Sequence, residues 1–145
     1  MLFGKRERLI RRILVVEDEP LVAFDNEYSL GEAGYEVVAT VDNLAAAKAA
    51  IEDEEQIDLV LTDIRLAGEG DGTGVARVAR TKGIPVLFVT GFCPEEAQSL
   101  AVGCLAKPYT DKVLKAALDA LDDVMQGKKV KKLPPQLSLY APAQD

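Results

Sequence analysis

Residues 57–63 read IDLVLTD, a short apolar run that is interrupted by one aspartate and closed by Asp63. A run of this kind is typical of a strand with both faces buried, as in a parallel sheet that is covered by helices. Four more runs of similar length and composition occupy residues 12–16, 35–41, 85–89 and 103–106. We therefore predict five strands.

Segments with helical periodicity lie between these strands. Apolar side chains recur every three to four residues in the predicted helices, over 20–33, 43–54, 73–82 and 110–125. Pro20 suits the first turn of the first helix, and Gly34 suits its end. Only residues 94–101 are available between the last two strands, so we expect a short or irregular fourth helix there. The alternation predicts an α/β fold with helices on both faces of a parallel sheet.

The 145 residues suit one domain and leave no room for a second folded output domain. We divide the chain into a basic N-terminal extension (1–11), a domain (12–126) and a basic, proline-containing C-terminal tail (127–145). The tail is expected to be extended and largely mobile. The apolar stretches are too short for a membrane span, and the basic start lacks the apolar core of a secretory signal. We therefore expect a cytoplasmic protein.

The chain has no histidine and two cysteines. The lack of histidine removes the usual serine and cysteine nucleophile pairs and the commonest zinc ligand. Any chemistry must therefore depend on carboxylates, lysine, threonine or backbone groups. Cys93 and Cys104 match no metal-binding or redox spacing, and a disulfide is not expected in a reducing compartment. We predict two free thiols.

The net charge of -7 is unevenly distributed along the chain. Both ends are basic, whereas the body over 13–126 carries a large acidic excess. An acidic surface argues against general binding of nucleic acid. We interpret the basic ends as solubilising tails, with docking of one end on the acidic body or on a partner as the alternative.

Polar side chains follow four of the predicted strands. Because parallel strands with right-handed crossovers point the same way, their carboxyl ends meet at one edge of the sheet, where open α/β folds bind ligands. The residues at this edge are Glu17, Asp18 and Glu19 after the first strand, Asp63 after the third, Thr90 and Gly91 after the fourth, and Lys107 and Pro108 after the fifth.

This set of residues suits phosphoryl transfer. Carboxylates that converge in one pocket repel one another unless cations neutralise them, and Mg²⁺ accepts one or two carboxylates together with a phosphate oxygen. With Mg²⁺ and Lys107 present, the Asp63 carboxylate can attack a phosphoryl group, because this reaction depends mainly on positioning and charge neutralisation. Lys107, Thr90 and the backbone amide of Gly91 would hold the phosphoryl oxygens.

The chain resembles the response-regulator receiver (CheY-like) family over nearly its full length. The matching segments are 13–19 (ILVVEDE), 59–66 (LVLTDIRL), 85–91 (PVLFVTG) and 105–109 (LAKPY). The resemblance implies a flavodoxin-like, doubly wound, five-stranded parallel sheet in the order 2-1-3-4-5 with five helices. It also implies a cis peptide between Lys107 and Pro108.

The resemblance assigns roles to the residues at the sheet edge. Asp63 would be the phosphoacceptor and a metal ligand, and Asp18 would bind Mg²⁺ directly. Glu17 would act on the metal largely through water. The backbone carbonyl of Arg65 would complete the protein ligands.

The implied function is that of a bacterial two-component phosphoacceptor, which takes a phosphoryl group from a histidine kinase or a phosphotransfer protein. Thr90 and Lys107 would contact that group. Such a protein is not an enzyme beyond catalysing its own phosphorylation and dephosphorylation. It would act as a single domain, through protein–protein interaction or as a phosphate sink, and as a monomer or weak dimer. No nucleic-acid or membrane partner is expected.

Two stretches depart from the usual receiver pattern. Cys104 stands where most receivers have Tyr or Phe, three residues before the lysine, so we expect residues 92–101 to respond to phosphorylation in place of an aromatic side chain. Residues 88–93 (FVTGFC) match the motif Phe-Ala-Thr-Gly-(uncharged)-Tyr of the FATGUY subgroup in four of six places. Members are often single-domain receivers from alphaproteobacteria, paired with histidine kinases of the HWE or HisKA-2 type.

Three other functions remain open. The first is a protein-interaction module of the same fold that is not phosphorylated. The second is a flavin carrier, although the acidic loop at 17–20 would repel a phosphate. The third is a haloacid-dehalogenase phosphatase, which would need a second acid where Arg65 stands. Colour and Mg²⁺ dependence distinguish these possibilities.

Overall fold

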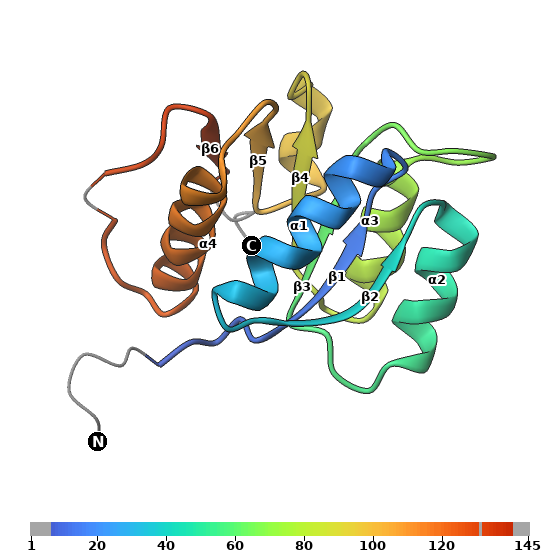
Figure 1. Cartoon of the computed structure of the whole chain (residues 1–145), viewed down its shortest axis with the longest axis horizontal. Helices are drawn as coiled ribbons and strands as arrows, with labels where there is room; N and C mark the ends of the chain where they lie inside the picture. The colour runs from blue at the N-terminus through green and yellow to red at the C-terminus, as the bar shows by residue number, and fades with distance from the viewer. Residues whose placement is uncertain (1–6, 131, 141–145) are drawn as a thin grey trace.

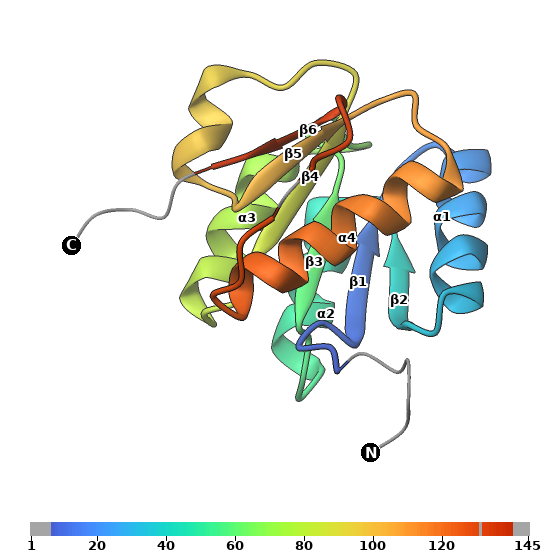
Figure 2. The ribbon, with the colours of Figure 1, turned by 90° about the vertical axis from the view of Figure 1, so that its left-hand side faces the viewer.

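The computed structural model describes residues 7–130 and 132–140. A central sheet lies between two layers of helices (Figure 1, Figure 2). In chain order, the elements are β1 (Arg12–Val16), α1 (Pro20–Glu32), β2 (Glu36–Val41), α2 (Leu44–Asp53), β3 (Leu59–Thr62), α3 (Gly72–Thr81), β4 (Val86–Thr90), the 3-10 helix η1 (Glu95–Ser99), β5 (Gly103–Ala106), α4 (Asp111–Met125) and β6 (Leu137–Leu139).

The sheet has the strand order β2-β1-β3-β4-β5-β6, in which β6 runs antiparallel to β5 and the other neighbours are parallel. Every residue of β3 and β4 is buried, as their apolar runs predict. The first five strands confirm the predicted order 2-1-3-4-5. The prediction of five strands is wrong, because a sixth is supplied by the segment that was interpreted as an extended tail.

β6 joins the sheet through an apolar side chain and a glycine. Leu137 is 5% exposed and belongs to the core cluster of the α1 and α4 face. Gly103 permits the close approach of the two strands, since a Cβ atom there would lie 2.8 Å from the Ser138 carbonyl oxygen. The backbone N–H of Tyr140 also donates to the Val102 carbonyl at 3.0 Å. The apolar residues within the basic tail are the signal that could have predicted this strand.

Two apolar layers form the core, and alternate residues of the central strands serve each one. Ile13 and Val15 face the layer that contains α1 and α4. Leu14 and Val16 face the layer that contains α2 and α3. Figure 2 shows the helix pairs on opposite faces of the sheet. This alternation explains why strands with both faces buried read as continuous apolar runs.

Three of the helices, α2, α3 and α4, begin at side chains that accept hydrogen bonds from free backbone N–H groups. Asn43 caps α2 at Ala46, and Asp71 caps α3. Within the described residues there are four α-helices and the 3-10 helix η1, so the prediction of five helices is wrong in its count of α-helices, whereas the expected short or irregular segment at 94–101 is confirmed. Five residues between Pro94 and Leu100 leave space only for this 3-10 turn.

The two cysteines form a disulfide, so the prediction of free thiols is wrong. Cys93 lies in the connection between β4 and η1, and Cys104 lies in β5. Their Cα atoms are 6.1 Å apart, within the range that a disulfide spans. This proximity was not predicted, because the spacing of two cysteines along the sequence does not show that the connection after β4 lies beside β5.

Residues near the N-terminus also contact the domain. The buried Asp122 carboxylate of α4 accepts hydrogen bonds from the N–H groups of Leu9 and Ile10. The Arg8 guanidinium lies 4.2 Å from the centre of the Tyr35 ring. These contacts extend the packed part of the chain before β1. Within 7–130 and 132–140, no helix has the length and apolar character needed to cross a membrane.

Candidate functional site

The candidate site lies where four neighbouring parallel strands end. Glu17 and Asp18 follow β1, and Asp63 follows β3. Thr90 is the last residue of β4, and Lys107 follows β5. The fold therefore brings the predicted residues to one edge of the sheet, which is the place where doubly wound folds bind ligands.

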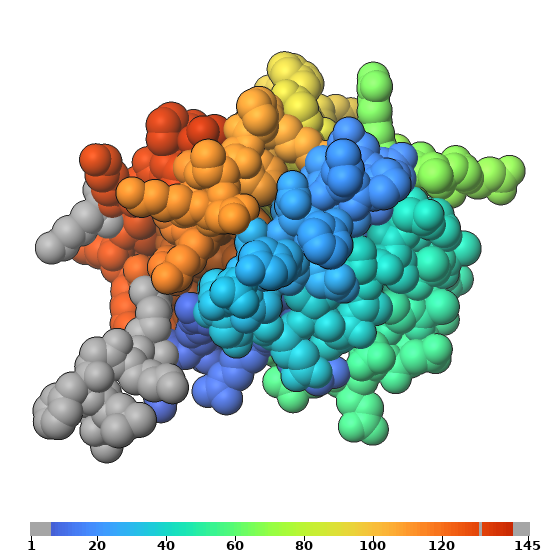
Figure 3. All heavy atoms as spheres, in the orientation of Figure 1, coloured from blue at the N-terminus to red at the C-terminus, as the bar shows by residue number. Residues whose placement is uncertain are grey.

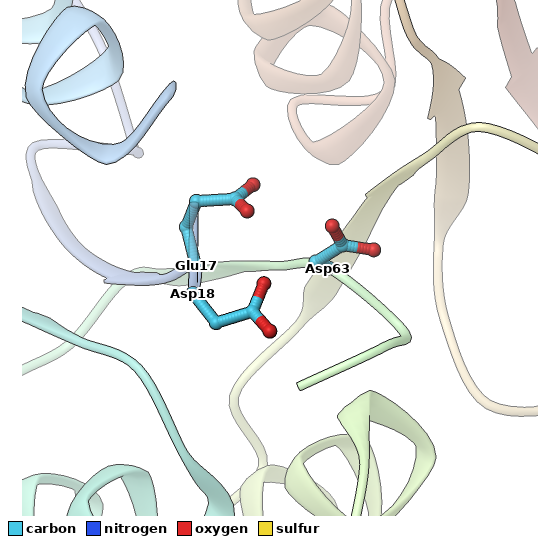
Figure 4. A group of neighbouring side chains, drawn as sticks. All are labelled: Glu17, Asp18 and Asp63. Carbon is cyan, nitrogen blue, oxygen red and sulfur yellow. The ribbon is translucent and has the colours of Figure 1, made fainter. Parts of the chain in front are cut away.

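Three carboxylates face a common space at this edge (Figure 4). One oxygen each from Glu17, Asp18 and Asp63 can be chosen so that all lie within 4.8 Å of one another. Glu17 and Asp63 are 2% and 6% exposed, whereas Asp18 is half-buried. Burial raises the pKa of Glu17, and this effect exceeds the opposing effect of its hydrogen bond with Lys107. Such a cluster needs a cation to remain ionised.

Lys107 supplies positive charge to this cluster. Its Nζ lies 2.7 Å from Asp63 Oδ2, 2.8 Å from Glu17 Oε1 and 3.0 Å from Glu19 Oε1. Burial lowers the pKa of Lys107, but these hydrogen bonds outweigh burial and raise the pKa above its ordinary value. Lys107 is therefore an ammonium that is held directly beside the Asp63 carboxylate.

The backbone around Asp63 fixes the position of its side chain. The Asp63 N–H donates to the Val16 carbonyl at 3.0 Å, and this bond continues the pairing of β1 with β3. Gly72 packs directly against the Asp63 peptide, since a Cβ atom at that glycine would lie 2.0 Å from the Asp63 carbonyl oxygen. The requirement for glycine at this point was not predicted, because the sequence shows only a glycine-rich loop.

The remaining predicted residues lie around this centre. Thr90 is 7% exposed, and its carbonyl accepts the Lys107 N–H at 2.7 Å, so the ends of β4 and β5 are joined. Gly91 follows directly, and a Cβ atom there would meet no heavy atom within 4 Å. The Arg65 N–H donates to Asp63 Oδ1 at 3.3 Å. The Lys107–Pro108 peptide is cis, as predicted.

Two further groups at the site were not predicted as functional. Glu19 pairs with Lys107 from the acidic run after β1, and that run is the signal for it. Tyr109 donates a hydrogen bond from its hydroxyl to Asn26 Oδ1 at 3.0 Å, which joins the chain after Lys107 to α1. Burial raises the pKa of Tyr109 to about 12, so the hydroxyl stays protonated near neutral pH and can donate this hydrogen bond.

The acidic cluster opens into a hollow between α1, β2 and α2. The hollow has a volume of about 430 Å³, and its lining residues include Glu17, Asp18, Thr40 and Asp42. Of the three carboxylates, those of Glu17 and Asp18 line this hollow, and that of Asp63 does not. All three are suited to a hard cation, because carboxylate oxygens of this charge and spacing are ligands that Mg²⁺ prefers.

The fold and the site define a doubly wound α/β protein with an acidic cluster that could hold a metal ion, beside a lysine, at the carboxyl edge of its sheet. The chain belongs to the response regulator receiver domain family, whose family model matches residues 13–119. Receiver domains are parts of two-component systems.

Individual relatives agree with this assignment. The chain is 32% identical to the transcriptional regulatory protein AruR of Pseudomonas aeruginosa over 111 residues, which are 73% of this chain and 45% of AruR. The chain spans less than half the length of the curated relatives it matches.

Solved structures of receiver proteins are similar over most of their length. A response regulator receiver protein from Sinorhizobium medicae has a TM-score of 0.69 and 34% identity, with 79% of this chain and 95% of that chain covered. The response regulator TrrA from Thermotoga maritima, solved in complex with Mg²⁺ and BeF, has a TM-score of 0.69 and 27% identity, with coverage of 77% and 99%.

Proposed function

We propose that this chain accepts a phosphoryl group on Asp63 in a Mg²⁺-dependent reaction. The observation that carries the proposal is the position of Asp63, whose carboxylate lies 2.7 Å from Lys107 Nζ and beside two further acids. A carboxylate needs neighbouring positive charge to approach a phosphoryl group, because both carry negative charge. This site supplies that charge from Lys107 and offers a position for a cation.

Four groups of this chain would act on the phosphoryl group. An oxygen of Asp63 forms the bond to phosphorus as the bond to the donor's imidazole nitrogen breaks. Lys107 then exchanges part of its contact with Asp63 for a phosphoryl oxygen, and Thr90 and the Gly91 N–H donate to the other oxygens. When bound by Asp18, Asp63 and the Arg65 carbonyl, with Glu17 acting through water, Mg²⁺ supplies further neutralising charge.

The donor that we propose is a histidine kinase or a phosphotransfer protein. α1 begins three residues after Glu17 and lies on the molecular surface beside α4 (Figure 3). Leu21, Phe24 and Tyr28 follow one another at helical spacing on α1 and are 80%, 63% and 61% exposed. An apolar stripe of this kind beside the phosphoacceptor suits the packing of a partner helix.

We further propose the narrower assignments that the sequence suggests. The chain would act as a single-domain receiver of the FATGUY subgroup with a kinase of the HWE or HisKA-2 type, as a monomer or weak dimer. Its output would be protein–protein interaction or the drainage of phosphate from another regulator. It would turn over no separate substrate beyond its own phosphorylation and dephosphorylation.

Incubation with acetyl phosphate and Mg²⁺ tests the central proposal. Intact-protein mass spectrometry should show one added phosphate in wild type and in Asp53→Asn, an exposed acid at the end of α2. Asp63→Asn should show none. Undiminished label in Asp63→Asn would place the phosphate elsewhere. A wild-type chain that takes no phosphate from acetyl phosphate or from phosphorylated kinases would favour the phosphorylation-independent interaction module.

A further inference from the structure

The Cys93–Cys104 disulfide connects two segments that border the phosphoacceptor site. Cys93 lies three residues after Thr90, and Cys104 lies three residues before Lys107. β4 and β5 are paired in register, with Phe88 opposite Cys104. The bond therefore ties the chain that leaves Thr90 to the strand that leads to Lys107.

The two cysteine residues differ in their exposure to solvent. Cys104 is completely buried in the core cluster that includes Phe88 and Ala97. Cys93 is partly exposed and packs at the margin of the same cluster. A molecule in solution that attacks this disulfide is therefore expected to do so at Cys93, the more exposed of the two residues.

The segment enclosed by the disulfide is anchored to the core by the buried Ala97 and is otherwise held by a few hydrogen bonds. η1 is a single 3-10 stretch in which the Ala97 N–H donates to the Pro94 carbonyl at 3.1 Å. Its far end is held by a hydrogen bond from Arg80 to the Ser99 carbonyl. The disulfide holds the near end, so its reduction would release the part of the segment that adjoins Thr90 and Gly91.

We propose that Cys93 and Cys104 form a redox-modification site, which undergoes thiol–disulfide exchange with a low-molecular-weight disulfide and sets how far residues 92–101 can respond to phosphate. The second half of this proposal rests on the proposed function, since it concerns the response to phosphorylation of Asp63. The exchange itself does not depend on phosphorylation.

The exchange balances in two steps. The Cys93 thiolate attacks one sulfur of a disulfide RSSR, which forms a Cys93–S–S–R bond and releases RS⁻. The Cys104 thiolate then attacks Cys93 Sγ, which forms the Cys93–Cys104 bond and releases a second RS⁻. The cysteine pair loses two electrons, RSSR gains them, and the two cysteine protons end on the released thiolates. Two thiolates RS⁻ reverse the sequence: the first attacks Cys93 Sγ and releases the Cys104 thiolate, and the second attacks the outer sulfur of Cys93–S–S–R, which releases the Cys93 thiolate and re-forms RSSR.

Equilibration of the folded chain with mixtures of reduced and oxidised glutathione tests the exchange. Alkylation followed by mass spectrometry should show both cysteines changing together over the range of mixtures. In Cys93→Ser, the buried Cys104 should form a mixed disulfide at least about tenfold more slowly than Cys93 does in Cys104→Ala, because only Cys93 is accessible. A pair that stays oxidised in excess dithiothreitol, or equal rates in the two variants, would overturn the proposal.

Hydrogen exchange with and without beryllofluoride and Mg²⁺ tests the coupling. The change in amide protection over 92–101 that beryllofluoride causes should be several-fold larger in the reduced chain than in the oxidised chain. Cys93→Ser should show the larger change under both reducing and oxidising conditions, because it cannot form the disulfide. Equal changes in the two redox states would overturn the coupling. Failure of acetyl phosphate to label either state would overturn the phosphoacceptor function and the coupling, but would leave the exchange chemistry as measured.

Discussion

The two halves of the site are held in different ways. Glu17 and Asp63 follow strands whose backbone pairing continues into the site, through the bonds Glu17 N–H to Val41 and Asp63 N–H to Val16 at 2.8 and 3.0 Å. Thr90 instead precedes a connection that contains only a 3-10 helix and is fastened by a side-chain crosslink. Backbone pairing therefore fixes the acidic half, Glu17 and Asp63, whereas the connection that follows Thr90 can change when the disulfide is reduced.

The largest expected effect comes from Lys107, which joins the two halves. Lys107→Ala removes the ammonium that contacts three carboxylates, so the rate of labelling by acetyl phosphate should fall by about 100-fold, the loss typical for one transition-state donor. Lys112→Ala on the exposed start of α4 is the matched control and should label at the wild-type rate. Wild-type labelling of Lys107→Ala would make this lysine a loop residue without a role.

Gly72 tests the rigidity of the acidic half. Gly72→Ala places a Cβ atom against the Asp63 carbonyl, so it should lower the free energy of unfolding by about 1–3 kcal/mol, as overpacking does. Gly31→Ala in α1 meets no atom within 4 Å and should be neutral or stabilising by up to about 1 kcal/mol. Urea unfolding measures both. If Gly72→Ala and Gly31→Ala are equally stable, the peptide at Asp63 can shift to accommodate the added Cβ atom, and the acidic half is not rigid.

Mg²⁺ binding separates two acids within the same half. Asp18 is half-buried at the hollow, whereas Glu17 is buried and already bonded to Lys107. Asp18→Ala should therefore weaken Mg²⁺ binding by about tenfold, and Glu17→Ala should weaken it less. Isothermal titration calorimetry with MgCl₂ measures the two constants. Equal losses would mean that the division into a direct and a water-mediated ligand is wrong.

The smallest effect is expected at Glu19. Its side chain is 62% exposed although it pairs with Lys107 at 3.0 Å, and exposed ion pairs contribute little in water. Glu19→Ala should change the labelling rate by less than about threefold. A loss as large as that of Lys107→Ala would mean that Glu19 positions the Lys107 ammonium. Glu19 would then belong functionally to the acidic half, with Glu17 and Asp63.

The sequence was most informative where local pattern and topology agree. The apolar runs predicted the five parallel strands, and the rule that parallel strands end at one edge predicted that Glu17, Asp18, Asp63 and Lys107 lie together. The predicted bounds of α1 to α4 lie within one or two residues of the observed ones, because the apolar periodicity stops where each helix stops, and Pro20 begins α1 as predicted.

The features that were not predicted depend on contacts between distant segments. The disulfide forms because Cys93 lies beside β5 in the folded chain. β6 forms because the C-terminal segment folds back and pairs with β5. The contact of Gly72 with the Asp63 peptide is likewise a property of the packed loop. The periodicity of apolar residues indicates which face of a single helix or strand is buried, but it does not indicate which segments contact one another.

β6 also determines how this sheet can associate with other chains. Without it, the unpaired N–H and C=O groups of β5 would form an open template for another strand, which is a common route to aggregation. With β6 in place, the unpaired N–H and C=O groups at this edge of the sheet belong to a strand of only three residues, Leu137–Leu139. A template so short supports few cross-chain hydrogen bonds, so a partner that approaches from this edge must recognise side chains instead of extending the sheet.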